Sequence, residues 1–191
     1  MFINMDMYKL KWTRLQGEIF RLLCIKAGLK LSLREIARFL HVSPTAVSNA
    51  LMLLVTEEVI TINKNKTIKL LSIELNRDSS KVIAMKRIEN LRLIFESGLS
   101  DFLLNEFPGC TSILFGSYSR GSDIMTESGE NNSDIDIAII GAKEKKVNLR
   151  EFSKLLERQI NINFYDSWKN IHRNLKDNIL NGILLQGGVE L

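Results

Sequence analysis

The sequence of 191 residues contains few of the residues that constrain a chain covalently or conformationally. Two prolines and 11 glycines exclude collagen-like repeats and a linker-dominated architecture. Cys24 and Cys110 lie far apart without a CxxC or histidine neighbour, which predicts two reduced thiols used as small hydrophobic side chains. No apolar run approaches the ~18–20 residues of a membrane span. The N-terminus lacks the basic region and cleavage site of a signal peptide, so we expect a cytoplasmic protein with no membrane partner.

Hydrophobic residues make up 45% of the chain, which is enough for ordinary cores. The net charge of +4 is unevenly divided, because residues 1–76 carry +5, residues 77–109 carry 0 and residues 110–191 carry −1. A basic N-terminal part favours a polyanionic partner, although a solvated surface of mixed sign explains the same numbers. We predict a mixed α+β chain with an N-terminal domain at 1–76, a helical connector at 77–109 and a second domain at 110–191.

The first 76 residues show three helical segments followed by a hairpin. Apolar spacing predicts a helix that ends near Gly28, and Ser32 with Glu35 has the form of a capping box that starts a short second helix. Ser43 followed by Pro44 predicts the start of a third helix. Two β-type runs, 59–62 and 67–70, then bracket a polar, basic tip.

This arrangement resembles a winged helix-turn-helix domain. The resemblance implies that the third helix enters the major groove of double-stranded DNA while the hairpin tip meets phosphate. The residues nominated for the groove are Ser43, Thr45, Ser48 and Asn49, and those for phosphate are Lys64 and Lys66. The third helix carries no lysine or arginine, and winged helices also serve as protein-contact modules, so another partner remains an alternative.

Residues 78–107 read as mostly helical, with apolar positions spread over more than one stripe. Such a helix packs between parts of a protein or against a second chain. We therefore expect this connector to join the two domains, and a homodimer through the connector is a further expectation.

The segment from Cys110 onward carries the residues best suited to ligand binding or catalysis. A strand-like run leads into Gly116 and Ser117, whose turn offers backbone N–H groups and a hydroxyl to phosphate oxygens, and Arg120 adds a nearby cation. Within a later apolar strand, alternation places Asp134 and Asp136 on one face. Two carboxylates at this spacing can bind the same hard divalent cation.

Together these motifs resemble the nucleotidyltransferase superfamily that includes DNA polymerase beta, in its minimal form. The resemblance covers roughly residues 110–166 and implies a small mixed sheet flanked by helices. It assigns Gly116 and Ser117 to phosphate binding, and Asp134 and Asp136 to catalysis through Mg²⁺ or Mn²⁺. Arg120 is expected to contact phosphate. The implied substrate is a nucleoside triphosphate, ATP first, whose nucleoside monophosphate goes to a hydroxyl of RNA or of a protein, such as a toxin partner.

Two departures from the family pattern weaken the transferase prediction. The loop at 122–132 is longer than usual, and we interpret it as an exposed insertion or a mobile lid. The third carboxylate is replaced by Asn161 or Asn163, whose amides can bind a metal but cannot act as a base. Two hypotheses follow: an active nucleotidyltransferase with a DNA-binding domain, or a weak or inactive one that acts as a nucleotide-sensing transcriptional regulator or antitoxin-type partner protein.

Overall fold

The computed structural model describes residues 11–64 and 71–189, and the chain divides into two compact units. Unit 1 contains Met1–Leu23 and Lys30–Asn76, and unit 2 contains Cys24–Leu29 and Arg77–Leu191. The segment predicted as a connector, 77–109, therefore falls within unit 2. The helices and two small sheets confirm the predicted mixed α+β class.

No single described helix is long and apolar enough to cross a membrane. Among the described helices, only α2 and α3 taken together, a pair bent by 108°, have the length and composition of a membrane span.

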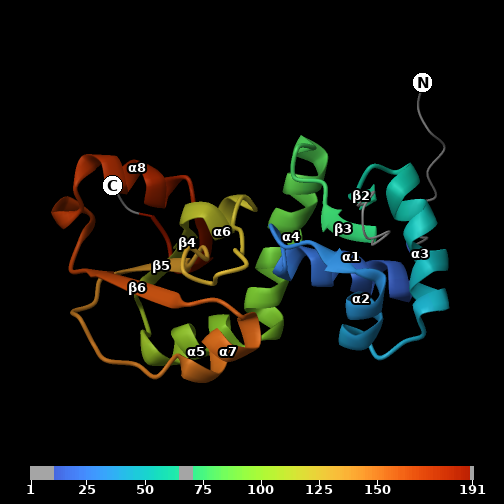
Figure 1. Ribbon diagram of the computed structural model, residues 1–191. Coiled ribbons are helices and arrows are strands. Elements are labelled where there is room, and N and C mark those ends of the chain that lie inside the picture. The colour runs from blue at the N-terminus through green and yellow to red at the C-terminus, as the bar shows by residue number, and fades with distance from the viewer. Residues whose placement is uncertain (1–10, 65–70, 190–191) are drawn as a thin grey trace. The chain divides into compact units, whose positions relative to one another are not determined.

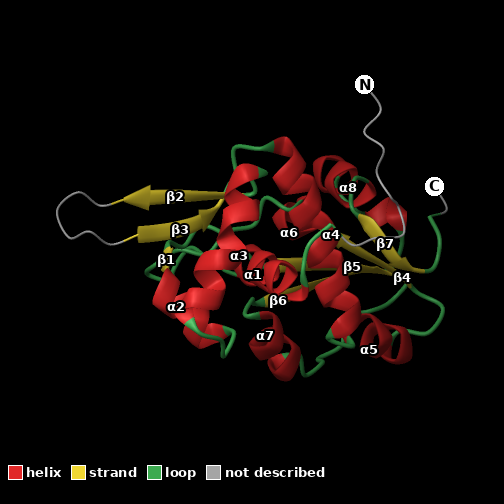
Figure 2. Cartoon of the chain, turned by 90° about the vertical axis from the view of Figure 1, so that its right-hand side faces the viewer, coloured by secondary structure: helices red, strands yellow, loops and turns green. Residues whose placement is uncertain are grey.

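Unit 1 begins with α1 (Arg14–Ile25), whose last residues belong to unit 2, and continues through β1 (Leu31–Ser32), α2 (Leu33–Phe39) and α3 (Pro44–Thr56). The hairpin strands β2 (Ile60–Lys64) and β3 (Leu71–Leu75) follow, as Figure 2 shows. The sheet is antiparallel with the order β1-β3-β2. Its core consists of fully buried apolar side chains from all three helices and the hairpin, among them Ile19, Leu23, Ile36, Val47, Leu54, Val59 and Ile73.

Local sequence signals explain where the helices of unit 1 start. The Ser32 hydroxyl accepts from the Glu35 backbone N–H at 3.3 Å, and the Glu35 carboxylate accepts from the Ser32 N–H at 2.7 Å. This predicted capping box also lowers the pKa of Glu35, chiefly through the hydrogen bond from the Ser32 backbone. The Ser43 hydroxyl accepts from the Ala46 N–H at 3.2 Å and begins α3 in the same way.

Unit 2 opens with the helices α4 (Ser80–Glu96) and α5 (Leu99–Glu106), followed by β4 (Thr111–Phe115), α6 (Gly116–Arg120) and β5 (Ile135–Ile140). It continues with α7 (Arg150–Leu156), β6 (Ile160–Tyr165), the 3-10 turn η1 (Trp168–Asn170), α8 (Arg173–Leu180) and β7 (Ile183–Gln186). The sheet order is β6-β5-β4-β7, in which β5 and β6 are parallel and the other pairs antiparallel. This is a small mixed sheet flanked by helices, as the resemblance implies.

The two faces of this sheet have different coverings (Figure 1). One face packs against α4, α5 and α7, and its core includes Ile94, Leu103, Leu114, Ile137, Ile139 and Leu156. The other face packs against η1 and α8, and its core includes Ile113, Phe115, Ala138, Ile140, Trp168, Ile171 and Ile179. Because side chains alternate along a strand, Asp136 and Asn161 share a face with the second core and not with the first.

Candidate functional site

The acidic pair lies at the start of β5. Asp134 directly precedes the strand and Asp136 is its second residue, and both side chains are half-buried. Asp136 is paired in register with Phe115 on β4 and with Asn161 on β6. The pair therefore sits where three strand ends supply rigid backbone, which is the placement that a metal or phosphate site needs.

Asn161 is the amide that joins this pair. Its Nδ2 donates to Asp134 Oδ2 at 3.0 Å, and its Oδ1 accepts from the Gln159 amide at 3.0 Å. Asn163, the other residue considered, is paired with Ala138 two positions farther along and lines a shallow depression at the end of β6 with Asp166 and Asn170. Of the two amides considered, Asn161 is therefore the one that contacts the acidic pair.

The surroundings of the pair shift the titration of Asp136. Burial raises the pKa of Asp136, and the negative charge of Asp134 raises it further, while hydrogen bonding from Asn161 opposes both. Among the described residues no cluster of three or more His, Cys, Asp or Glu side chains forms. Two carboxylates and one amide oxygen still match the oxygen ligands of Mg²⁺ or Mn²⁺, provided that the Asn161 amide turns its oxygen toward the ion.

Gly116 makes the closest approach of the Gly-Ser turn to this pair. Its φ is +77°, in the left-handed region, and a Cβ built on it would lie 2.6 Å from Asp136 Oδ2. Only a glycine fits there without moving the carboxylate. Ser117 follows at partial exposure, so of the predicted phosphate residues Gly116 is the one shown to approach the acidic pair.

Arg120 has no contact with the acidic pair comparable to that of Gly116. It is exposed at the last position of α6, about 6 Å along the helix axis from Gly116. The expected phosphate contact of Arg120 therefore remains a prediction.

The loop that precedes Asp134 is more ordered than an exposed insertion. Ile124 and Ser133 exchange two hydrogen bonds, N–H to the Ser133 hydroxyl at 3.0 Å and the Ser133 N–H to the Ile124 carbonyl at 2.8 Å. Asp123, at its start, is 1% exposed and contacts Lys86 and Arg158. The predicted exposed insertion therefore describes Ser122 and 127–131, whereas Asp123 is buried and 124–126 and Asn132 are half-buried.

Sequence reasoning missed this buried cluster around Asp123, although one signal for it exists. The buried face of α4 runs at steps of four through Val82, Lys86, Asn90 and Ile94. Two polar residues in the middle of an apolar stripe indicate a buried partner elsewhere in the chain.

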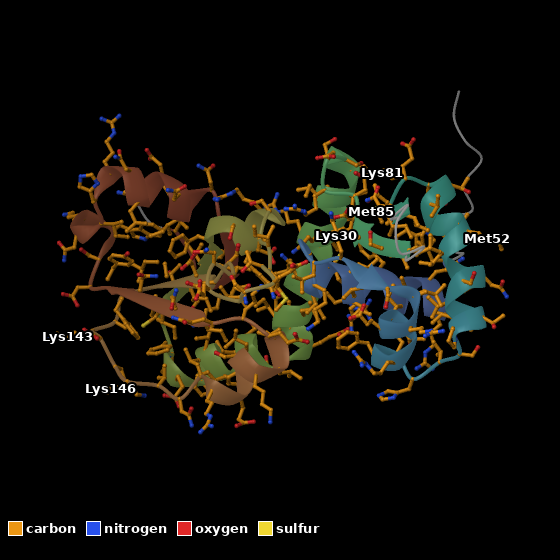
Figure 3. All side chains as sticks on the ribbon, viewed as in Figure 1. Lys30, Met52, Lys81, Met85, Lys143 and Lys146 are labelled. Carbon is orange, nitrogen blue, oxygen red and sulfur yellow. The ribbon has the colours of Figure 1, made fainter. Side chains whose placement is uncertain are left out.

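In unit 1 the nominated groove residues lie on one surface. Thr45, Ser48 and Asn49 are exposed on α3, and Ser43 is exposed while its hydroxyl caps the helix. Met52 continues this outer surface at 66% exposure and is labelled in Figure 3. Lys64 ends β2 in register with Leu71, and Lys66 lies outside the described residues.

Two basic residues of α2 also escaped the sequence reasoning. Arg34 and Arg38 are both exposed and lie one helical turn apart. In a helix-turn-helix the first of the two helices crosses the phosphate backbone, so an i, i+4 arginine pair on this helix was the available signal.

The three helices, the two-residue β1 and the β2–β3 hairpin of unit 1 occur in the order that defines a winged helix. Searches against protein-family models and curated proteins found no match. Among solved structures, the adhesin competence repressor AdcR from Streptococcus pyogenes is 21% identical over 51% of this chain and 69% of that chain, with a TM-score of 0.40. ZitR from Lactococcus lactis in complex with DNA is 24% identical over 56% and 70%, with a TM-score of 0.38.

A MepR variant from S. aureus is 21% identical over 50% of this chain and 64% of that chain, with a TM-score of 0.38. Likenesses of this size carry no statement about function.

Proposed function

We propose that this protein is a DNA-binding regulator whose second unit binds a nucleoside triphosphate with Mg²⁺ or Mn²⁺. The observation that carries the ligand part is the contact of Asn161 with Asp134, 3.0 Å, next to Asp136. It supports the proposal because an amide lies against one of two carboxylates that are two residues apart in the sequence. An amide in the third position supports binding of a metal–nucleotide complex but supplies no base to an acceptor hydroxyl.

The DNA part of the proposal is supported by the winged helix and by the polar outer surface of α3. Hydroxyls and an amide at Thr45, Ser48 and Asn49 suit base edges or phosphates, and Arg34 and Arg38 suit the backbone. The N-terminal charge of +5 supplies the salt-dependent term. Because α3 itself lacks lysine and arginine, we expect most of the affinity to come from outside this helix.

The nucleotide part is tested by calorimetry with ATP in the presence of Mg²⁺ or Mn²⁺. Asp134→Asn and Asp136→Asn should each weaken binding at least about tenfold, because each removes a negative ligand of the cation. The matched control is Asp177→Asn, which removes the same charge from an exposed position on α8. Binding that survives both site variants would remove Asp134 and Asp136 from the ligand shell.

The DNA part is tested by selecting duplexes from a random pool and measuring their affinity at several salt concentrations. Ser48→Glu should weaken binding more than Ser128→Glu, an equal charge change in the exposed loop of unit 2. If the two variants bind alike, the outer surface of α3 is not the DNA-binding surface. The measurement with and without ATP and Mg²⁺ then shows whether the ligand changes DNA affinity.

Nucleotidyl transfer is the second candidate, and the Gly116–Asp136 approach favours it. The closeness of Gly116 to Asp136 supports this candidate, because a transfer reaction requires phosphate and metal ligands to lie close together. Incubation with α-labelled ATP, Mn²⁺ and RNA or the protein itself tests this reading. Labelled product that disappears in Asp134→Asn supports transfer, whereas intact binding with no product supports the regulator.

A further inference from the structure

Four polar side chains of unit 2 are buried together, and the acidic pair is not among them. Lys86 and Asn90 come from α4, Asp123 from the loop after α6, and Arg158 from the turn before β6. Their exposures are 0%, 1%, 1% and 4%, in that order. Side chains of these types are almost never so completely buried unless they are paired.

Asp123 is the centre of this cluster. Its Oδ1 accepts from Lys86 Nζ and from Asn90 Nδ2, the latter at 2.7 Å, and its Oδ2 accepts from an Arg158 terminal nitrogen at 3.1 Å. Both oxygens of the carboxylate are therefore used by donors from separate parts of the chain. With two cations and one anion, the cluster has a surplus positive charge when Lys86 is protonated, and burial lowers the pKa of Lys86.

Each segment that carries the candidate nucleotide site is attached to this centre. Asn90 Nδ2 also donates to the Tyr118 carbonyl at 2.8 Å, which holds α6 and its Gly-Ser turn. The loop that begins at Asp123 closes on itself just before Asp134, through the paired hydrogen bonds at 124 and 133. Arg158 lies two residues before β6, the strand that carries Asn161.

We propose that Asp123 is a positioning residue that holds the Gly-Ser turn, Asp134 and Asn161 in the arrangement that binds the metal–nucleotide complex. This inference rests on the proposed function for its ligand and adds a residue that does not touch that ligand. The proposal depends on the directionality of the hydrogen bonds to Asp123. Apolar packing of the same volume is often as stabilising as a buried ion pair, but only directed hydrogen bonds fix the orientation of three separate segments.

The test separates positioning from stability. Asp123→Asn keeps the shape of the side chain but replaces one acceptor oxygen with an NH2 donor. Depending on which way the amide turns, either Arg158 or the pair Lys86 and Asn90 then loses its acceptor. Leu103→Ala is the matched control, because Leu103 is fully buried in α5 and its loss leaves a cavity without touching the cluster. Both proteins are compared with wild type at a temperature well below their unfolding transitions.

We expect Asp123→Asn to bind ATP with Mg²⁺ at least about tenfold more weakly than wild type, because preorganisation of the site is lost. Leu103→Ala should keep the wild-type affinity. Asn90→Leu, which leaves the Asp123–Arg158 pair in place, is the second variant if Asp123→Asn does not fold. It should show the same direction of change through α6. Wild-type affinity in the folded Asp123 or Asn90 variant, or an equal loss in Leu103→Ala, overturns the proposal.

Hydrogen exchange of the ligand-free protein gives a readout that does not depend on the proposed function. In Asp123→Asn the backbone amides of three segments should exchange faster than in wild type: 116–120, 124–134 and 160–162. In Leu103→Ala the exchange rates of these segments should equal those of wild type. If wild type binds no ATP, the proposed function fails and exchange alone decides the role of Asp123. Unchanged exchange in these segments overturns it.

Discussion

Replacing Asn161 with Asp is the most informative single change in the candidate site. In the present structure the amide donates to Asp134 Oδ2 at 3.0 Å, so the contact is attractive. Asn161→Asp removes that donor and puts a third carboxylate beside Asp134 and Asp136. We expect a less stable metal-free protein, tighter binding of Mg²⁺ and faster nucleotidyl transfer.

Coulomb's law sets the scale of the stability loss. Two unit charges about 4 Å apart repel by about 4 kcal/mol at an effective dielectric constant of 20, and by about 1 kcal/mol in water. Because Asp134 and Asn161 are half-buried, the loss should fall between these limits. A bound divalent cation reverses the sign of the interaction. The new carboxylate can also act as a base toward the acceptor hydroxyl, an effect of about 10²–10⁴-fold on rate.

The assay has two parts. Thermal unfolding with and without Mg²⁺ should show Asn161→Asp below wild type in the absence of the ion, with a larger gain on its addition. Transfer from α-labelled ATP should rise above the wild-type rate. Asn163→Asp is the matched control, since Asn163 lies two positions farther along the same strand and face. Equal behaviour of the two variants would refute the assignment of Asn161 to the third ligand position.

Three further predictions concern the same unit. Because burial raises the folded-state pKa of Asp136, this carboxyl stabilises the fold below its ordinary pKa of about 4, and the contribution is lost as pH rises through the raised value. Asp136→Asn should therefore be more stable than wild type at pH 7 without metal. In thermal unfolding, this difference in stability should close toward pH 4. Gly116→Ala should weaken ATP binding about tenfold or more and lower stability by about 1–2 kcal/mol, because φ is +77° and the new Cβ meets Asp136; calorimetry and urea unfolding check this. Lys86→Met should change the free energy of unfolding by less than about 1.5 kcal/mol, since it leaves Asp123 and Arg158 balanced, whereas Asp123→Asn should cost about 3–5 kcal/mol in urea unfolding. A Lys86→Met loss as large as that of Asp123→Asn would contradict this charge balance.

Much of the fold was predictable because its signals are local. The capping box at Ser32 and the Ser43–Pro44 start of α3 each depend on residues within one helical turn, and both occur as predicted. The alternation that puts Asp136 and Asn161 on polar positions of buried strands is also local. The register that places Asn161 rather than Asn163 beside Asp136 is not, because it is set by the pairing of β5 with β6.

The cluster around Asp123 could not be predicted from local sequence signals, because its contacts join residues far apart in the chain. Asp123 lies 37 residues from Lys86 and 35 from Arg158, and each of these residues alone is typical of a solvated surface. Nothing in the composition of an acidic loop distinguishes one carboxylate that is buried from those that are exposed. Only the packing of α4, α6 and the turn before β6 around one point makes Asp123 different from Glu127 or Glu130.

The electrostatics of the acidic pair bear on both candidate functions at once. A ligand shifts a conformational equilibrium only to the extent that it binds one state more strongly. Under the proposed function the half-buried pair supplies such a difference in unit 2, because ionised Asp134 and Asp136 repel each other and a bound cation would offset that repulsion. Cation binding would produce this free-energy difference whether or not transfer follows. It is what a regulator that responds to nucleotide requires, and for that response the amide at Asn161 is no defect.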